Sequence, residues 1–293
     1  MEIVIQQIAA GLATGGIYAA VALALVMIYQ ATELVNFAQG EMAMFSTYIA
    51  WSMINAGMPY WVAFFLTIVI SLIGGVLIER FVIRPVEDAP ILSIVIVFIG
   101  LLVIFNSLAG WIFSYVIKEF PSPFPSHAIV IGHIQFGSHD IGSVIVTLVV
   151  LALLYVFFRF TPLGLAMRAA AQNPVSSRLV GIRVGWMLAL GWGLAAAVGS
   201  VAGMMVAHKV FLDPNMMSGI LLYSFAAALL GGITSPGGAV FGGFTVGVLE
   251  NLVGSFVPFV GNELKLTVAL VLIIGVLLVK PSGLFGRTVV TRV

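Results

Sequence analysis

The 293-residue sequence contains no cysteine, which excludes a disulfide framework, a thiolate metal site and a thiol nucleophile. Charge is also scarce, because Lys, Arg, Asp and Glu make up 8% of the residues, against about 25% in an average soluble domain. So few charges cannot cover the water-facing surface of a body of this size. The basic residues are scattered and the net charge is only +1, so nucleic-acid binding has no electrostatic basis.

The motifs of several enzyme classes are missing as well. The chain has no G-x-x-x-x-G-K-[ST] loop to cradle ATP phosphates and no H-E-x-x-H zinc motif. His127, His133 and His139 are six residues apart, which makes no tight ligand set, so we interpret them as surface histidines. Ser200 and His208 lie about 12 Å apart along one predicted helix, too far for a hydrogen bond. We therefore expect no catalytic residue, no metal site and no cofactor bound by this chain.

The sequence is instead rich in long hydrophobic runs, which account for most of its 61% hydrophobic residues. A membrane-spanning helix needs about 20 mostly apolar residues, whereas barrel strands alternate over about 10. The run at 36–55 and the pair within 219–257 are the weakest candidates, because they contain polar residues or a Pro-Gly-Gly break. The sequence thus predicts an all-α polytopic membrane protein, one domain over residues 1–293, with eight or nine transmembrane helices. The candidate runs are 7–29, 36–55, 60–79, 91–117, 141–158, 186–207, 219–235, 238–257 and 264–279.

Basic residues predict the orientation of these helices, because they favour the cytoplasmic side. The 80–90 loop, the 159–185 loop and the residues after 279 contain nine basic residues, whereas the alternate loops contain three. We therefore expect the 159–185 loop and the C-terminal tail in the cytoplasm. The same rule accounts for Arg80 and Arg84.

The 159–185 loop is predicted to form two short helices. Its first part is rich in helix formers, Asn173 is a good N-cap, and Pro174 suits the first position of a second helix. Gly181 fits the end of that helix. A solvated loop has no need of such a rigid corner, whereas a docking surface for a cytoplasmic partner does. The alternative is an interfacial helix lying on anionic lipid.

Glu41 and Glu250 are carboxylates within apolar runs, where a charge costs about 2.5–3.5 kcal/mol at a helix centre. The polar residues Asn36, Gln39, Asn106 and Asn251 accompany them. Such residues face a bundle interior or a watery cavity by default, and each carboxylate must be hydrated, hydrogen-bonded or protonated. The alternative for Glu41 is that it snorkels at the cytoplasmic interface.

Small residues recur four apart, a spacing that lets helix backbones approach closely in lipid. We interpret these pairs as helix-packing sites. The Pro236-Gly237-Gly238 sequence, which ends one apolar run and begins another, predicts a tight turn or a discontinuous helix. The pairs are Gly11 and Gly15, Gly199 and Gly203, Gly238 and Gly242, and Gly243 and Gly247.

Four segments, in order along the chain, carry a family pattern: Val35–Glu41, Glu79-Arg80 followed by Arg84-Pro85, the run from Gly164 to Ile182, and the glycine-rich run from Gly231 to Glu250. Together they resemble branched-chain amino acid ABC transporter permeases of the LivH type, which are inner membrane components of binding-protein-dependent transport systems. The sequence departs from the family at Gln39, where a His is usual, and at Phe98–Leu102, where a Thr-x-Gly-x-Ser pattern is degraded.

The resemblance implies a permease subunit of an ABC importer for branched-chain or related amino acids, in a bacterial or archaeal cytoplasmic membrane. Its expected partners are a second homologous permease, two cytoplasmic ATPase subunits that hold ATP-Mg, and an extracytoplasmic substrate-binding protein. The exact substrate stays open among branched-chain amino acids, urea, amides and other amino acids. The alternative is a secondary transporter driven by an ion gradient, with Glu41 or Glu250 as its proton-coupling carboxylate.

The resemblance also implies roles for particular residues of this sequence. The helical loop at 159–185 would couple to the ATPase subunits, and Asn36, Gln39, Glu41 and Glu250 would belong to the translocation pathway. The residues assigned to the coupling element are Arg168, Asn173, Pro174, Arg178 and Gly181.

Overall fold

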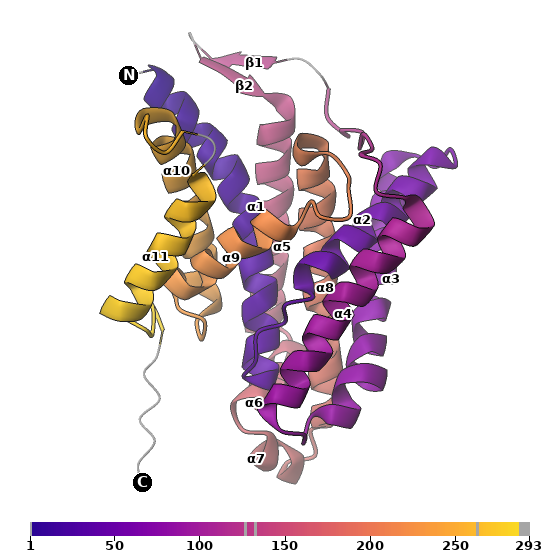
Figure 1. Ribbon diagram of the computed structural model, residues 1–293. Coiled ribbons are helices and arrows are strands. Elements are labelled where there is room, and N and C mark those ends of the chain that lie inside the picture. The colour runs from indigo at the N-terminus through magenta and orange to yellow at the C-terminus, as the bar shows by residue number, and fades with distance from the viewer. Residues whose placement is uncertain (1, 126–127, 132–133, 262–263, 287–293) are drawn as a thin grey trace. The chain divides into compact units, whose positions relative to one another are not determined.

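The computed structural model describes residues 2–125, 128–131, 134–261 and 264–286, so the predictions for His127 and His133 lie outside the described residues. The described chain is a series of α-helices interrupted by one β-hairpin, in which β1 pairs antiparallel with β2 (Figure 1). The all-α prediction missed this hairpin. The elements are α1 (Glu2–Thr32), α2 (Gln39–Asn55), α3 (Tyr60–Ile78), the π-helical turn η1 (Glu79–Ile83), the 3₁₀ turn η2 (Arg84–Val86), α4 (Ile91–Phe113), β1 (Ala128–Ile131), β2 (Ile134–Gly137), α5 (Ser138–Phe160), α6 (Pro162–Gln172), α7 (Pro174–Leu179), α8 (Val184–Val210), α9 (Ser218–Gly231), α10 (Pro236–Phe256) and α11 (Lys265–Val279).

Each of the nine predicted apolar runs contains a helix, but not every one of these helices is long enough to cross a bilayer. Within the described residues, six helical segments have the required length and apolar character, and they include α1, α3, α4, α5, α8 and α10. The other three, α2, α9 and α11, have 17, 14 and 15 residues. The predicted count of eight or nine transmembrane helices is therefore not confirmed. In the predicted run at 36–55, residues 36–38 form a turn, so α2 begins only at Gln39.

The chain divides into two compact units. The first comprises Met1–Val26, Phe124–Val146 and Gly219–Val293, and the second comprises Met27–Pro123 and Thr147–Ser218. The boundaries fall inside α1 and α5, so two continuous helices belong to both units. The single domain over residues 1–293 stays a prediction.

In the second unit α8 is the central helix. In its most apolar stretch of 18 residues, 89% of the residues are buried, and the neighbouring helices include α2, α3 and α6. Small residues bring these helices close together. A Cβ added to Gly193 would lie 2.7 Å from the carbonyl oxygen of Leu72 on α3, and one added to Gly203 would lie 2.8 Å from that of Ala43 on α2. The packing role predicted for Gly199 and Gly203 is therefore confirmed.

In the first unit, α1 and α10 cross at their glycines. A Cβ added to Gly15 would lie 2.8 Å from the Cα of Phe244, and one added to Gly11 would lie 2.7 Å from the Cα of Val248. On the α10 side, Gly243 and Gly247 lie directly against the backbone of α1. These backbones can approach so closely because neither helix carries a side chain at the crossing, which confirms the predicted packing role.

The predicted break at Pro236-Gly237-Gly238 is a tight turn between two separate helices. The hydroxyl oxygen of Ser235 accepts a hydrogen bond from the backbone N–H of Gly238 at 3.1 Å, and Pro236 occupies the first turn of α10. The backbones of Gly231 and Gly238 are in direct contact, and Gly242 lies against the carbonyl of Ala227. α9 and α10 therefore form an antiparallel helical hairpin.

Candidate functional site

The predicted pair of short helices is present, and its ends are set by local capping. The side chain of Thr161 caps α6 by accepting a hydrogen bond from the N–H of Gly164 at 3.0 Å. The Oδ1 of Asn173 accepts one from the N–H of Ser176 at 2.9 Å, and Pro174 starts α7. Gly181 follows α7 with a φ of +84°, a left-handed conformation that favours glycine. The predicted N-cap and stop of the second helix are confirmed.

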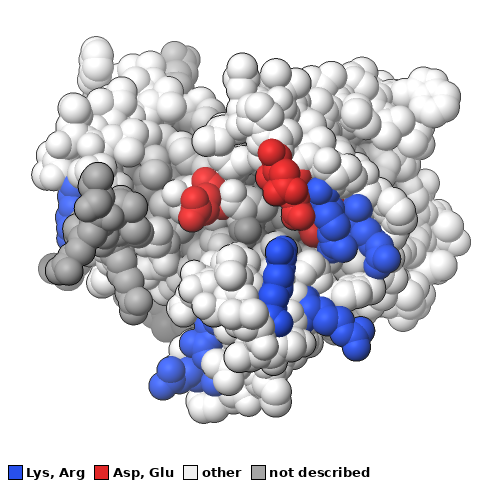
Figure 2. Space-filling model, turned by 90° about the horizontal axis from the view of Figure 1, so that it is seen from below, with Lys and Arg blue, Asp and Glu red and all other residues white. Residues whose placement is uncertain are grey.

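The outward side of α7 is apolar and exposed. Val175, Leu179 and Val180 are 70%, 84% and 76% exposed, and the exposed Arg178 lies between them in sequence. α6 and α7 lie at one end of the second unit, at the bottom of Figure 1. Figure 2 views the molecule from that side and shows basic side chains scattered over a largely uncharged surface. We call Val175, Arg178, Leu179 and Val180 the α7 surface.

Arg168 lies in a different environment from Arg178, although sequence reasoning assigned both to one coupling element. It is half-buried on α6, between the buried Met167 and Ala170. Its Nε is buried and has no hydrogen-bond partner among the described residues. The side chain lines a small cavity of about 40 Å³ together with Gln30 and others. Arg168 is therefore less accessible to a partner than Arg178 is.

Asn36 and Gln39 are fully buried and hold the start of α2 in place. The Oδ1 of Asn36 accepts a hydrogen bond from the N–H of Ala38 at 3.0 Å. The Nε2 of Gln39 donates to the carbonyl oxygen of Ala195 on α8 at 3.0 Å, which ties α2 to the central helix of the second unit. Both side chains thus make internal contacts of the fold.

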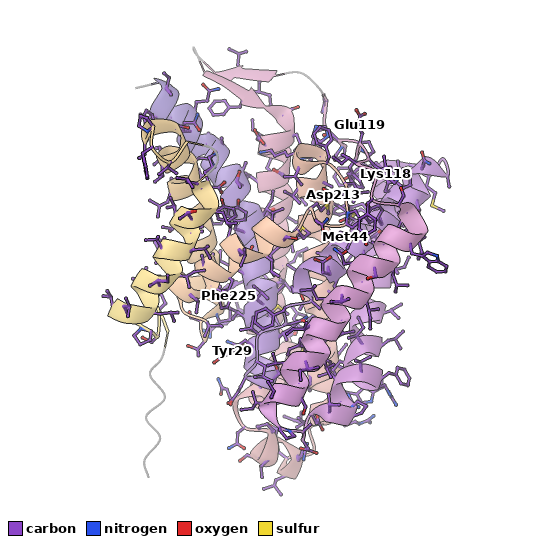
Figure 3. All side chains as sticks on the ribbon, viewed as in Figure 1. Tyr29, Met44, Lys118, Glu119, Asp213 and Phe225 are labelled. Carbon is purple, nitrogen blue, oxygen red and sulfur yellow. The ribbon has the colours of Figure 1, made fainter. Side chains whose placement is uncertain are left out.

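Glu41 lies in the first turn of α2, where a negative charge interacts favourably with the helix dipole. Its side chain is only 5% exposed, so it does not snorkel to an interface. The Nδ2 of Asn106 on α4 lies 3.5 Å from Glu41 Oε2, and it donates to the carbonyl oxygen of Pro214 at 2.8 Å and to Oδ1 of Asn215 at 3.1 Å. Asp213, labelled in Figure 3, accepts a hydrogen bond from the N–H of Asn215 at 2.6 Å. This polar cluster joins α2, α4 and the segment between α8 and α9.

Glu250 lies on α10 and belongs to the first unit. Tyr18 of α1 donates a hydrogen bond from its hydroxyl to Glu250 Oε2 at 2.6 Å. The Tyr18 ring is stacked on that of Tyr223 of α9, with centroids 5.0 Å apart. A carboxylate in an apolar run is expected to be hydrated, hydrogen-bonded or protonated, and Glu250 is hydrogen-bonded.

The residues considered for catalysis or metal binding are engaged elsewhere. Ser200 is buried and donates to the carbonyl of Ala197 at 2.7 Å, whereas His208 Nδ1 lies 3.0 Å from the carbonyl oxygen of Phe120. The interpretation of His139 as a surface residue is wrong, because its side chain is buried and its ring packs against that of Phe124. Within the described part of the chain, no three His, Asp or Glu residues gather in a way that could hold a metal ion.

Long apolar helices, large apolar side chains exposed along α3, α4 and α5, and the buried carboxylate of Glu41, which has no basic partner in the described contacts, define a multi-pass helical membrane protein. The sequence narrows this class further. Residues 7–277 match the family model described as the branched-chain amino acid transport system / permease component, and the chain belongs to this family. It is therefore a transport permease component rather than an enzyme.

Three relatives illustrate the extent of the similarity. The high-affinity branched-chain amino acid transport system permease protein LivH of Escherichia coli K12 is 32% identical, over 99% of this chain and 97% of that protein. The corresponding BraD of Pseudomonas aeruginosa is 30% identical over 99% and 98%. A probable branched-chain amino acid transport permease protein LivH of Methanocaldococcus jannaschii is 27% identical over 90% and 87%.

Among solved structures, PsaBC from Streptococcus pneumoniae in complex with Fab contains a chain with a similar fold. The TM-score is 0.51 over 93% of this chain and 91% of that chain, with 15% sequence identity. At this identity the similarity concerns the fold alone.

Proposed function

We propose that this chain is the permease subunit of an ABC importer for branched-chain or related amino acids, located in a bacterial or archaeal cytoplasmic membrane. Family membership supports the transport role and the substrate class. The observation that carries the coupling role is the α7 surface, an exposed apolar patch with an arginine on a capped, rigid helix. Because such a patch is unfavourable in water, it suits a protein partner.

In this proposal, the helices α6 and α7 lie in the cytoplasm and dock on ATPase subunits, which bind and hydrolyse ATP-Mg. Arg178 contacts the partner, whereas Asn173, Pro174 and Gly181 keep α7 rigid at its two ends. Arg168 belongs to the same coupling element, on α6. When the ATPase subunits close on ATP, they displace α7 as a rigid body. The membrane helices then change which side of the pathway is open.

The substrate would reach this chain from an extracytoplasmic binding protein and pass along a pathway shared with a second, homologous permease. Glu41 and Glu250 are the carboxylates of that pathway, and Asn36 and Gln39 set the position of the helix that carries Glu41. Glu41 suits a gating role, since the Asn106 amide near it also binds the segment between α8 and α9.

The assembly is tested by purifying the tagged chain from its native membranes in mild detergent and identifying the accompanying proteins by mass spectrometry. We expect ATPases with Walker motifs and a second permease, and ATP-dependent uptake when the complex is reconstituted with its binding protein. A chain that transports alone in proteoliposomes, and stops when an uncoupler is added, would instead be a secondary transporter.

Replacing Glu41 with Gln is expected to leave assembly intact and to change the rate of transport at least about fivefold, as the loss of an interaction of about 1 kcal/mol would. The reason is that Gln keeps the size of the side chain but replaces the carboxyl group that lies 3.5 Å from the Nδ2 of Asn106 with an amide. The matched control is Glu33→Gln, since Glu33 is an exposed carboxylate directly after α1. Equal transport rates in both variants would remove Glu41 from the pathway.

A further inference from the structure

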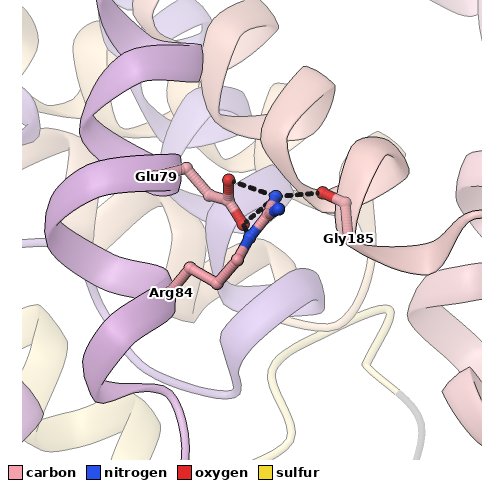
Figure 4. Close-up of polar contacts among 3 residues, drawn as sticks. All are labelled: Glu79, Arg84 and Gly185. Carbon is pink, nitrogen blue, oxygen red and sulfur yellow. Dashed lines mark hydrogen bonds and ion pairs between the residues drawn. The ribbon is translucent and has the colours of Figure 1, made fainter.

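The end of α3 and the start of α8 are joined by a compact set of polar contacts, which we call the α3–α8 clasp and which consists of Glu79, Arg84 and Gly185 (Figure 4). Arg84 Nη2 donates to Glu79 Oε2 at 2.7 Å and to Oε1 at 3.0 Å, and Nε donates to Oε1 at 3.2 Å. The same Nη2 donates to the carbonyl oxygen of Gly185 at 2.7 Å. Glu79 is almost completely buried, and the pair is the one salt bridge found among the described residues.

An ordinary α-helix would not bring this pair together. Residues five apart on an α-helix are rotated by about 140° around the axis, so Glu79 and Arg84 would point in different directions. In the structure, residues 79–83 form a π-helical turn, and the backbone N–H of Arg84 donates to the carbonyl oxygen of Glu79. The wider turn places both side chains on the side that faces α8. π-turns of this kind are uncommon and occur frequently at functional sites.

Two further features connect the clasp to α8. The Arg80 guanidinium carbon lies 5.1 Å from the centre of the Trp186 ring, a cation–π contact one residue beyond Gly185. A Cβ added to Gly185 would lie 3.3 Å from the Cζ of Arg84, so the glycine leaves room for the guanidinium. Gly185 and Trp186 lie in the first turn of α8, close in sequence to the end of α7 at Leu179.

We propose that the α3–α8 clasp transmits the displacement of α7 to α3, so that the start of α8 and the end of α3 move as one body during transport. This inference rests on the proposed function, in which α7 is displaced by the ATPases. Further along, α3 and α8 are already in backbone contact at Gly75 and Gly193. The clasp extends this contact to the end of α3, where the force from α7 arrives. Glu79 and Arg84 are therefore positioning residues that do not touch the substrate.

The test compares transport with ATP hydrolysis in the reconstituted complex. The double variant Glu79→Gln with Arg84→Gln removes both charges, so no buried charge is left without its partner. We expect it to hydrolyse ATP at close to the wild-type rate while transport per ATP falls at least about tenfold. Arg84→Lys keeps the charge but loses the two-pronged contact, and its loss should be smaller. The control is Lys280→Gln, which removes an exposed basic residue directly after α11, outside the 159–185 loop.

A direct measure of movement is available because the chain has no cysteine of its own. Spin labels attached through Phe81→Cys and Arg183→Cys, at two exposed positions, report the distance between the π-turn after α3 and the N-cap of α8. We expect this distance to stay constant when nucleotide binds to the complex, and to change in the double clasp variant. A distance that changes in the chain with an intact clasp overturns the proposal.

The outcomes separate the two proposals. If ATPases never accompany the unaltered chain, the proposed function itself fails. If they accompany it and the clasp variants keep wild-type transport per ATP, the transmission role fails and the proposed function stands. If the double variant does not fold, Arg84→Lys decides, because it keeps both charges but loses the two-pronged contact with Glu79. Wild-type coupling in that variant would overturn the clasp.

Discussion

The double substitution Arg178→Glu with Leu179→Asp is expected to release the ATPase subunits from the complex while the permease still inserts and folds. Both side chains are exposed on α7, and Leu179 is 84% exposed, so the fold loses almost no contact. Exposed substitutions of this kind change stability by about 0.5 kcal/mol or less. At a protein interface, arginine is typical of residues whose loss costs about 2 kcal/mol or more, and a polar group buried there without a partner costs about 1 kcal/mol or more. Together they should weaken docking at least about 100-fold.

The measurement is the ratio of ATPase to permease after purification in mild detergent, with monodispersity of the permease as the check on folding. The matched control is Lys209→Glu, which reverses an exposed basic residue near the other end of α8. It should keep the wild-type ratio. If the α7 double variant also keeps that ratio, the docking surface lies elsewhere and the α7 surface is free to lie on lipid, as in the alternative interpretation.

The substitution Gly247→Val is expected to prevent α1 and α10 from packing, with a loss of about 3 kcal/mol or more in stability. A side chain at Gly247 would collide with backbone atoms of Gly15 and Gly11, which cannot rotate away as a flexible side chain could. The helices would have to separate, and the hydrogen bond between Tyr18 and Glu250 near the crossing would be strained with them. We expect little monodisperse protein and a clearly lower melting temperature.

The control for this prediction is Gly275→Val, since Gly275 is also a helical glycine but a Cβ there would have open space around it. This control variant should purify like the unaltered chain. Equal melting temperatures for the two variants would show that the close approach of α1 and α10 does not stabilise the fold.

The short helices α6 and α7 could be predicted from the sequence because the signals for them are local. Asn173 caps the helix that begins at Pro174, and Gly181 ends it, because capping depends on residues only a few positions apart. The number of membrane-spanning helices was harder to predict, because hydropathy does not show where a helix begins. In the run at 36–55, the turn held by Asn36 shortens α2 to 17 residues.

Contacts between distant residues explain what sequence reasoning missed. The Glu41 cluster depends on Asn106 and Asn215, which come from separate elements and are brought together only by packing. Tyr18, which binds Glu250, has no sequence signal that separates it from other aromatic residues in apolar runs. Arg84 was explained by topology alone, because helical periodicity gives no reason to pair it with Glu79.

The sequence by itself determined that this protein is a multi-pass helical transport permease, which family it belongs to, and where the helix α7 begins and ends. These properties follow from composition, the length of apolar runs and short motifs, all of which are local along the chain. Only the tertiary structure decided that Arg178 is exposed while Arg168 is half-buried, that Glu41 is buried within a polar cluster, and that a π-turn pairs Glu79 with Arg84. Those outcomes depend on which helix faces pack together, and side-chain burial is decided by such long-range packing rather than by neighbours in sequence.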